Sequence, residues 1–128
     1  MDVRCGTDII DIRRIENAIK SNGRFAGKIY TDLEIDYCES KRAGKYQSYA
    51  ARFAAKEAFY KAIGAGLFAG PALTDVEVYN DETSGEPSLR LYGRAADAFR
   101  LKGGSGLSVS LSHTADMALA MVVILYEC

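Results

Sequence analysis

The segment from Gln47 to Ile63 is the strongest helix signal in this chain. It is rich in Ala, Lys, Phe and Glu, contains neither Gly nor Pro, and is followed at once by Gly64. Ala, Lys and Glu favour helices, and a glycine just past a helix commonly ends it in a left-handed backbone conformation. We therefore expect one long helix over residues 47–63, against which the rest of the chain packs.

Shorter patterns on both sides of this helix predict further helices and strands. Three shorter helices are expected, at residues 12–21 after a capping Asp11, at 32–40 after a capping box formed by Thr31 and Glu34, and at 93–101. Apolar and alternating runs predict strands at 3–10, 75–79, 88–92, 107–112 and 117–126. The order β-α-α-α-β-β-α-β-β indicates an α+β fold, a single domain over residues 1–128 with a mostly antiparallel sheet and the long helix packed on it.

Charge narrows the classes of ligand. The chain has 128 residues and a formal net charge of −1, so its overall charge gives no reason to expect nucleic acid binding. The first half, residues 1–64, has twelve Lys and Arg against nine Asp and Glu, whereas the second half has four against eight. This asymmetry suggests a positive face suited to an anionic ligand or an acidic partner, although it can also arise by chance in a short chain.

Cysteine, histidine and hydropathy patterns argue against several other classes. Cys5, Cys38 and Cys128 are widely spaced, which is typical of reduced thiols and not of a disulfide framework or a zinc site, and His113 is the only histidine. No signal-peptide pattern follows Met1, and the longest apolar run is shorter than the roughly 20 residues of a membrane span. We expect a cytoplasmic protein without a membrane segment.

Carboxylates in two segments are candidates for metal chemistry. Glu57 and Lys61 lie four residues apart on one face of the expected helix, among alanines that leave room for neighbouring elements. Asp8 follows the apolar part of the first expected strand, where a carboxylate is costly to bury unless it is paired or binds a metal. Together Asp8 and Glu57 could form the small carboxylate set that Mg²⁺ prefers. The alternatives are a solvated Glu57–Lys61 pair and a capping Asp8.

A third polar segment is Ser-Leu-Ser-His-Thr at 110–114. A single histidine at a strand end is usually structural, and the hydroxyl residues could simply form a turn. The glycine pattern of a serine hydrolase elbow is missing around these serines, and neither dinucleotide nor P-loop glycine motifs occur in the chain.

Taken together, these segments resemble the holo-acyl-carrier-protein synthases, the small, fatty-acid-type 4′-phosphopantetheinyl transferases. The resemblance rests on three blocks that follow in order along essentially the whole chain: 6–10 with Arg14 and Ile15, 52–58 with 61–64, and 110–114 with Ala118 and Ala120. The chain departs from the family in the segment 68–73, which looks slightly long, and at Leu73, where a larger aromatic residue is common.

The resemblance implies transfer of the phosphopantetheine group of coenzyme A (CoA) to a serine of an apo acyl carrier protein, with release of adenosine 3′,5′-bisphosphate, in support of fatty acid biosynthesis. It implies that Asp8 and Glu57 hold Mg²⁺ and that Lys61 contacts a phosphate. Such a transfer needs alignment and charge stabilisation more than covalent chemistry from the enzyme. Glu57, Asp8 or a metal-bound water could each accept the proton of the serine, and the sequence leaves this choice open.

The resemblance also implies how the rest of the donor is held. Arg52, Lys56 and His113 are expected at the 3′-phosphate and adenosine end, and Ser112 and Thr114 are expected to add hydroxyl donors. Gly64 and Gly66 would allow CoA to approach the backbone closely.

Partners follow from the same resemblance. Carrier proteins of this kind are acidic, so Arg14, with Arg13 and Arg24 nearby, is expected to form the docking surface. A homotrimer with active sites at the subunit interfaces is implied, and the run 117–124, apolar on both faces, agrees with it, although a buried strand of a monomer would read the same way. The alternative to an enzyme is a non-catalytic module that binds CoA or a carrier protein, and a purely structural trimer is a third hypothesis.

Overall fold

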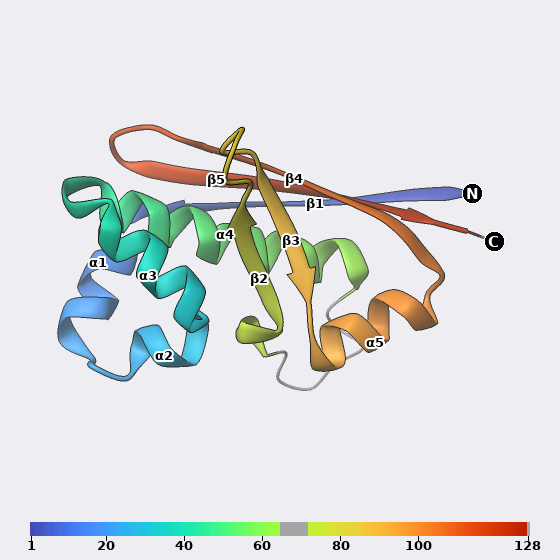
Figure 1. Cartoon of the computed structure of the whole chain (residues 1–128), viewed down its shortest axis with the longest axis horizontal. Coiled ribbons are helices and arrows are strands. Elements are labelled where there is room, and N and C mark those ends of the chain that lie inside the picture. Colours follow the sequence, from blue (N-terminus) through green and yellow to red (C-terminus); the bar gives the residue numbers. More distant parts are fainter. Residues whose placement is uncertain (65–71, 128) are drawn as a thin grey trace.

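The structure is a computed structural model and describes residues 1–64 and 72–127. Its helices and strands are β1 (Asp2–Asp11), α1 (Ile12–Ser21), α2 (Phe25–Ile29), α3 (Asp32–Ser40), α4 (Lys45–Ile63), β2 (Val76–Asn80), β3 (Pro87–Leu91), α5 (Gly93–Leu101), β4 (Gly104–His113) and β5 (Met117–Tyr126), with short 3-10 turns at Arg42–Gly44 and Leu73–Asp75. Figure 1 shows α4 lying along one face of the long strands, with the other helices and the β2–β3 hairpin on the same side.

The α+β class and the antiparallel pairing are confirmed, but the strands divide between two sheets. β1, β5 and β4 form a three-stranded antiparallel sheet in that order, and β2 pairs with β3 in a separate hairpin. The helix α2 was not expected, because five residues with Gly27 among them are too few to show a helical period. The Asp11 cap and the Thr31–Glu34 capping box are both present.

Small residues bring α4 against the three-stranded sheet. Ala54, Ala55 and Ala58 on the helix are fully buried, as is Ala120 on β5. A Cβ atom on Gly6 of β1 would lie only 2.1 Å from the carbonyl oxygen of Ala58, so this position needs glycine. The close approach places the residues that follow Gly6 directly beside the second half of α4.

A buried ion pair fixes α4 on its other side. Lys56 and Glu34 are both fully buried, and the Lys56 Nζ donates to Glu34 Oε1 at 2.7 Å and to the carbonyl oxygens of Leu73 and Val76. The other oxygen of Glu34 accepts from the backbone N–H of Val78. Because all three ammonium protons are used inside the core, the expectation that Lys56 contacts CoA is corrected: Lys56 joins α4 to α3 and β2.

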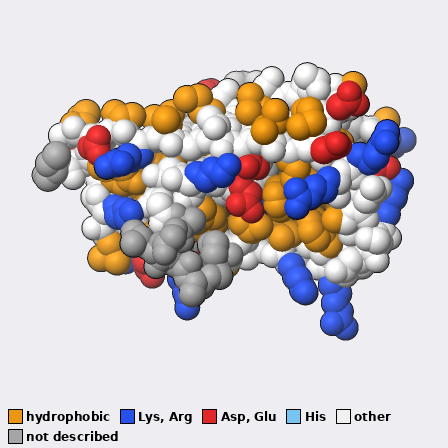
Figure 2. Space-filling model, turned by 180° about the vertical axis from the view of Figure 1, so that it is seen from behind, with side chains coloured by type: hydrophobic (Ala, Val, Ile, Leu, Met, Phe, Trp, Pro, Cys, Tyr) orange, Lys and Arg blue, Asp and Glu red, His pale blue; other side chains and the backbone are white. Residues whose placement is uncertain are grey.

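The face of the three-stranded sheet turned away from α4 carries exposed apolar side chains. They come from β1 and from the paired strand β5: Val3, Ile9, Leu119, Met121 and Leu125. Figure 2 shows hydrophobic side chains gathered along the edge of the molecule that carries these strands. Among the residues that the structure describes, no helix has the length and apolar composition needed to cross a bilayer.

Candidate active site

Asp8, Glu57 and Lys61 form one polar cluster between β1 and α4. The Lys61 Nζ lies 3.0 Å from Asp8 Oδ1 and donates to the carbonyl oxygen of Thr7, also at 3.0 Å. Glu57 lies one turn before Lys61 on the same side of α4 and is half-buried. The packing of Gly6 on α4 thus brings Glu57 and Lys61 close to Asp8, which lies about fifty positions earlier in the chain.

The charges of this cluster are unbalanced. Burial, followed by the negative charge of Asp8, raises the pKa of Glu57 above its usual range, while the positive charge of Lys61 opposes this shift. Two carboxyl groups therefore lie beside one amino group, and a bound cation would relieve the repulsion between the two carboxylates.

The donor set fits a magnesium ion. Among residues 1–64 and 72–127, no group of three or more Asp, Glu, His or Cys side chains could hold a metal. Asp8 and Glu57 would therefore be the two protein ligands of a metal bound here. Mg²⁺ is commonly held by one or two carboxylates, with waters and substrate phosphates completing its octahedron. The cluster therefore fits a metal that is shared with a phosphate substrate.

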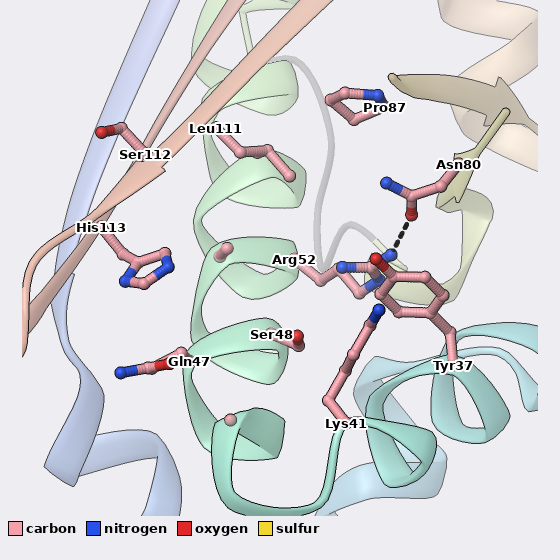
Figure 3. A pocket seen from close by; sticks show the side chains of 12 residues that line it. Tyr37, Lys41, Gln47, Ser48, Arg52, Asn80, Pro87, Leu111, Ser112 and His113 are labelled. Carbon is pink, nitrogen blue, oxygen red and sulfur yellow. Dashed lines mark hydrogen bonds between the residues drawn. The ribbon is translucent and has the colours of Figure 1, made fainter. Parts of the chain in front are cut away.

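A second polar site is a cavity of about 370 Å³ between α3, α4, β4 and the β2–β3 hairpin (Figure 3). Its lining includes Tyr37, Lys41, Gln47, Ser48, Arg52, Asn80, Pro87, Leu111, Ser112 and His113. Both cations of the cavity contact the ring of Tyr37, with Arg52 Cζ 4.1 Å and Lys41 Nζ 4.6 Å from its centroid. The cavity therefore combines positive charge with aromatic and apolar walls.

Arg52 makes this cavity suited to an anion. Arg52 is only 3% exposed, and one of its guanidinium nitrogens donates to Asn80 Oδ1. Its Nε has no hydrogen-bond partner, and no carboxylate of the described residues forms an ion pair with it. A buried cation without a counter-ion is unfavourable, so an anionic ligand beside Arg52 would stabilise it.

Of the other residues expected to bind CoA, some line this cavity and others do not. Ser112 and His113 lie in the cavity with Arg52, whereas the Thr114 hydroxyl accepts from the backbone N–H groups of Asp116 and Met117 and so forms the β4–β5 turn. Gly64 ends α4 with a left-handed φ of 88° and lies on the Lys61 side of the helix. Gly66 lies outside the described residues.

The expected docking residues are exposed. Arg13 and Arg14 lie on α1, and Arg24 precedes α2. Because β1 continues directly into α1, these arginines begin only a few residues after Asp8. The basic surface is therefore close in the chain to the carboxylate cluster.

A single chain does not unite the two polar sites. β5 separates β1, which carries Asp8, from β4, which carries His113. On α4, Arg52 and Glu57 are five residues apart, which corresponds to a rotation of about 140° around the helix axis. The cluster of Asp8, Glu57 and Lys61 (the carboxylate cluster) and the cavity that contains Arg52 and His113 (the anion cavity) therefore lie on different sides of α4.

The sequence did not identify Tyr37, Lys41 and Asn80 as site residues. Tyr37 and Lys41 lie one turn apart at the end of α3, Asn80 ends β2, and none of the three lies in the blocks that carry the family resemblance. The only indication in the sequence was indirect: a buried Arg52 would need side-chain partners, but the sequence does not show which residues lie beside it.

Comparisons with known proteins find similar sequences over nearly the whole chain. A family model described as the 4′-phosphopantetheinyl transferase superfamily matches residues 4–120. A relative from Ruminiclostridium cellulolyticum, named holo-[acyl-carrier-protein] synthase, is 50% identical over 97% of this chain and 92% of its own length. A relative of the same name from Geobacter sp. strain M21 is 47% identical over 93% of this chain and 94% of its own.

Solved structures match the fold over all or nearly all of the chain. A Chronobacterium ammoniagenes ACPS–CoA complex superposes with a TM-score of 0.86 and 25% identity and covers 100% of both chains. A Bacillus anthracis holo-(acyl-carrier-protein) synthase in complex with CoA (3′,5′-ADP) has a TM-score of 0.77 and 31% identity over 97% of this chain and 96% of its own.

Proposed function

Because this chain belongs to the 4′-phosphopantetheinyl transferase superfamily, we propose that it is a holo-[acyl-carrier-protein] synthase. It transfers the 4′-phosphopantetheine group of CoA to a serine of apo acyl carrier protein and releases adenosine 3′,5′-bisphosphate. The observation that carries the chemistry is the cluster of Asp8, Glu57 and Lys61. The names of the curated relatives favour this enzyme over a non-catalytic binding module.

Asp8 and Glu57 hold Mg²⁺ in this proposal. When bound, the metal supplies Lewis-acid stabilisation of the charge that develops on the pyrophosphate oxygens. Lys61, already within reach of Asp8 Oδ1, turns its ammonium to the transferring phosphate and neutralises part of that charge. Glu57 and Asp8 both remain candidates to accept the proton of the attacking serine.

The anion cavity receives the adenosine end of CoA. Arg52 offers its guanidinium group to the 3′-phosphate, and Lys41 and His113 add positive or hydrogen-bonding groups around it. Ser112 supplies a hydroxyl, and Pro87 and Leu111 provide apolar contacts for the base. This placement keeps the donor's other end free to reach a carboxylate cluster.

Two copies of the chain complete one site. Since Asp8 and Glu57 lie on a different side of α4 from Arg52 and His113, the carboxylate cluster of one protomer meets the anion cavity of its partner. Such a head-to-tail contact closes into a ring, and the family resemblance implies three copies. The apolar outer face of β1 and β5 would be covered by the other copies in that homotrimer.

The carrier protein docks on the basic surface of α1. Arg13 and Arg14 are exposed there, with Arg24 nearby, and they complement an acidic partner. Their position just after β1 would bring the serine of the carrier towards Asp8. The reaction would supply holo carrier protein for fatty acid biosynthesis in the cytoplasm.

The direct test is intact-protein mass spectrometry of an apo acyl carrier protein. Incubation with this protein, CoA and Mg²⁺ should add the mass of one phosphopantetheine group, and EDTA should abolish the gain. CoA binding without any mass gain, with several carrier proteins tried, would instead support the non-catalytic module.

A further inference from the structure

We propose that Tyr37 is a positioning residue that holds Arg52 and Lys41 for the 3′-phosphate and so makes the enzyme select CoA over 3′-dephospho-CoA. The proposal rests on the proposed function of the anion cavity. It concerns a residue on α3, an element that carries none of the residues expected to bind CoA.

The ring of Tyr37 contacts both cations of the cavity. Arg52 Cζ lies 4.1 Å and Lys41 Nζ 4.6 Å from the ring centroid, both well within the range of cation–π attraction. Figure 3 shows the ring beside the guanidinium of Arg52 and the end of Lys41, at the wall of the cavity opposite His113. One side chain therefore fixes the positions of two charges that come from different elements.

This contact matters because nothing else in the described ranges neutralises the two cations. Neither Arg52 nor Lys41 forms an ion pair with an Asp or Glu of residues 1–64 or 72–127. Two like charges in one small cavity repel each other, and the negative face of the ring offsets part of that repulsion. Without the ring, the exposed Lys41 can turn into solvent and Arg52 retains only Asn80 as a side-chain partner.

The ring, and not the hydroxyl, carries the effect. In the described part of the chain the Tyr37 hydroxyl makes no hydrogen bond, and the only hydrogen bond to Tyr37 from a side chain goes to its backbone carbonyl, from Ser40 Oγ. Tyr37→Phe thus keeps the cation contacts, whereas Tyr37→Leu removes them and still fills apolar space. These two substitutions form a matched pair.

The test compares steady-state transfer from CoA and from 3′-dephospho-CoA by the wild type and both variants. Tyr37→Leu should raise the KM for CoA about tenfold, the size expected for losing a partly desolvated cation–π contact, with kcat unchanged. Its KM for 3′-dephospho-CoA should not change, so the selectivity for CoA falls about tenfold. Tyr37→Phe should match the wild type in every parameter.

Two further measurements keep the outcome decisive. Calorimetry should show that Tyr37→Leu weakens binding of adenosine 3′,5′-bisphosphate but not of adenosine 5′-phosphate, which tests the inference even if no transfer is seen. Lys41→Met, at an exposed position, should also lower the selectivity, and its effect should not add fully to that of Tyr37→Leu.

If Tyr37→Leu raised the KM for CoA and for 3′-dephospho-CoA equally, the proposal would be overturned, because the ring would then serve only as a wall of the cavity. Wild-type selectivity in Tyr37→Leu would overturn it as well. Absence of transfer by the wild type, with phosphate-selective binding that depends on Tyr37, would contradict the proposed function and leave the role of Tyr37 supported.

Discussion

Glu57→Gln should lower the rate of phosphopantetheine transfer about a thousandfold, because metal stabilisation of transition-state charge is worth several kcal/mol and each 1.4 kcal/mol is a factor of ten. The amide has nearly the size of the carboxylate but no charge, so Asp8 alone would face the metal. The fold should persist, since Glu57 is half-buried and its charge is unfavourable in the metal-free protein, where burial and Asp8 raise its pKa.

The experiment measures transfer over a range of Mg²⁺ concentrations, with circular dichroism to check folding. Glu82→Gln, at an exposed position in the β2–β3 hairpin, is the matched control and should behave as the wild type. A Glu57→Gln protein that retained the full EDTA-sensitive rate would show that Glu57 does not bind the metal.

Lys56→Met should destabilise the protein by about 3–5 kcal/mol, the usual result of removing one partner from a buried ion pair. Glu34 would remain fully buried with its charge uncompensated, and the carbonyl oxygens of Leu73 and Val76 would lose a donor. Urea unfolding at a fixed protein concentration measures the change, and the exposed Lys28→Met serves as the control.

A second substitution separates the ion pair from general packing. Glu34→Gln in the Lys56→Met background removes the uncompensated charge and keeps an acceptor oxygen for one of the two backbone N–H groups, of Thr31 or of Val78, that now donate to Glu34, so it should recover part of the lost stability. The folded Lys56→Met protein should retain the wild-type KM for CoA. A raised KM for CoA without loss of stability would show that Lys56 contacts CoA and would contradict its role in the core.

The sequence predicted elements better than their arrangement. The helix α4, the caps of α1 and α3, and most strand positions follow from local composition and periodicity. Local patterns cannot show that β2 and β3 leave the main sheet, because pairing depends on packing against α4. The short α2 has too few residues for a periodic signal.

The site shows the same limit at the level of single residues. The sequence predicted a role for Asp8 and Glu57, but their proximity depends on the contact between Gly6 and Ala58, which no local pattern reveals. In the sequence, Lys56 and Lys61 are both lysines near Glu57 on the same predicted helix. The ion pair with Glu34, a residue distant in the chain, makes Lys56 a core residue. The separation of His113 from Asp8 depends on the strand order, in which β5 lies between β1 and β4, and no local pattern reveals that order.

Mixing two inactive variants tests most directly whether this transferase builds its site from two chains. One variant carries Glu57→Gln and the other carries Arg52→Gln with His113→Ala, and the two are refolded together in equal amounts. In a head-to-tail ring about a quarter of the sites would then take both intact halves, so about a quarter of the wild-type rate should return. The readout is the mass gain of the apo carrier protein in the presence of CoA and Mg²⁺. If the mixture stays as inactive as the separate variants while the wild type is active, each site lies within one chain.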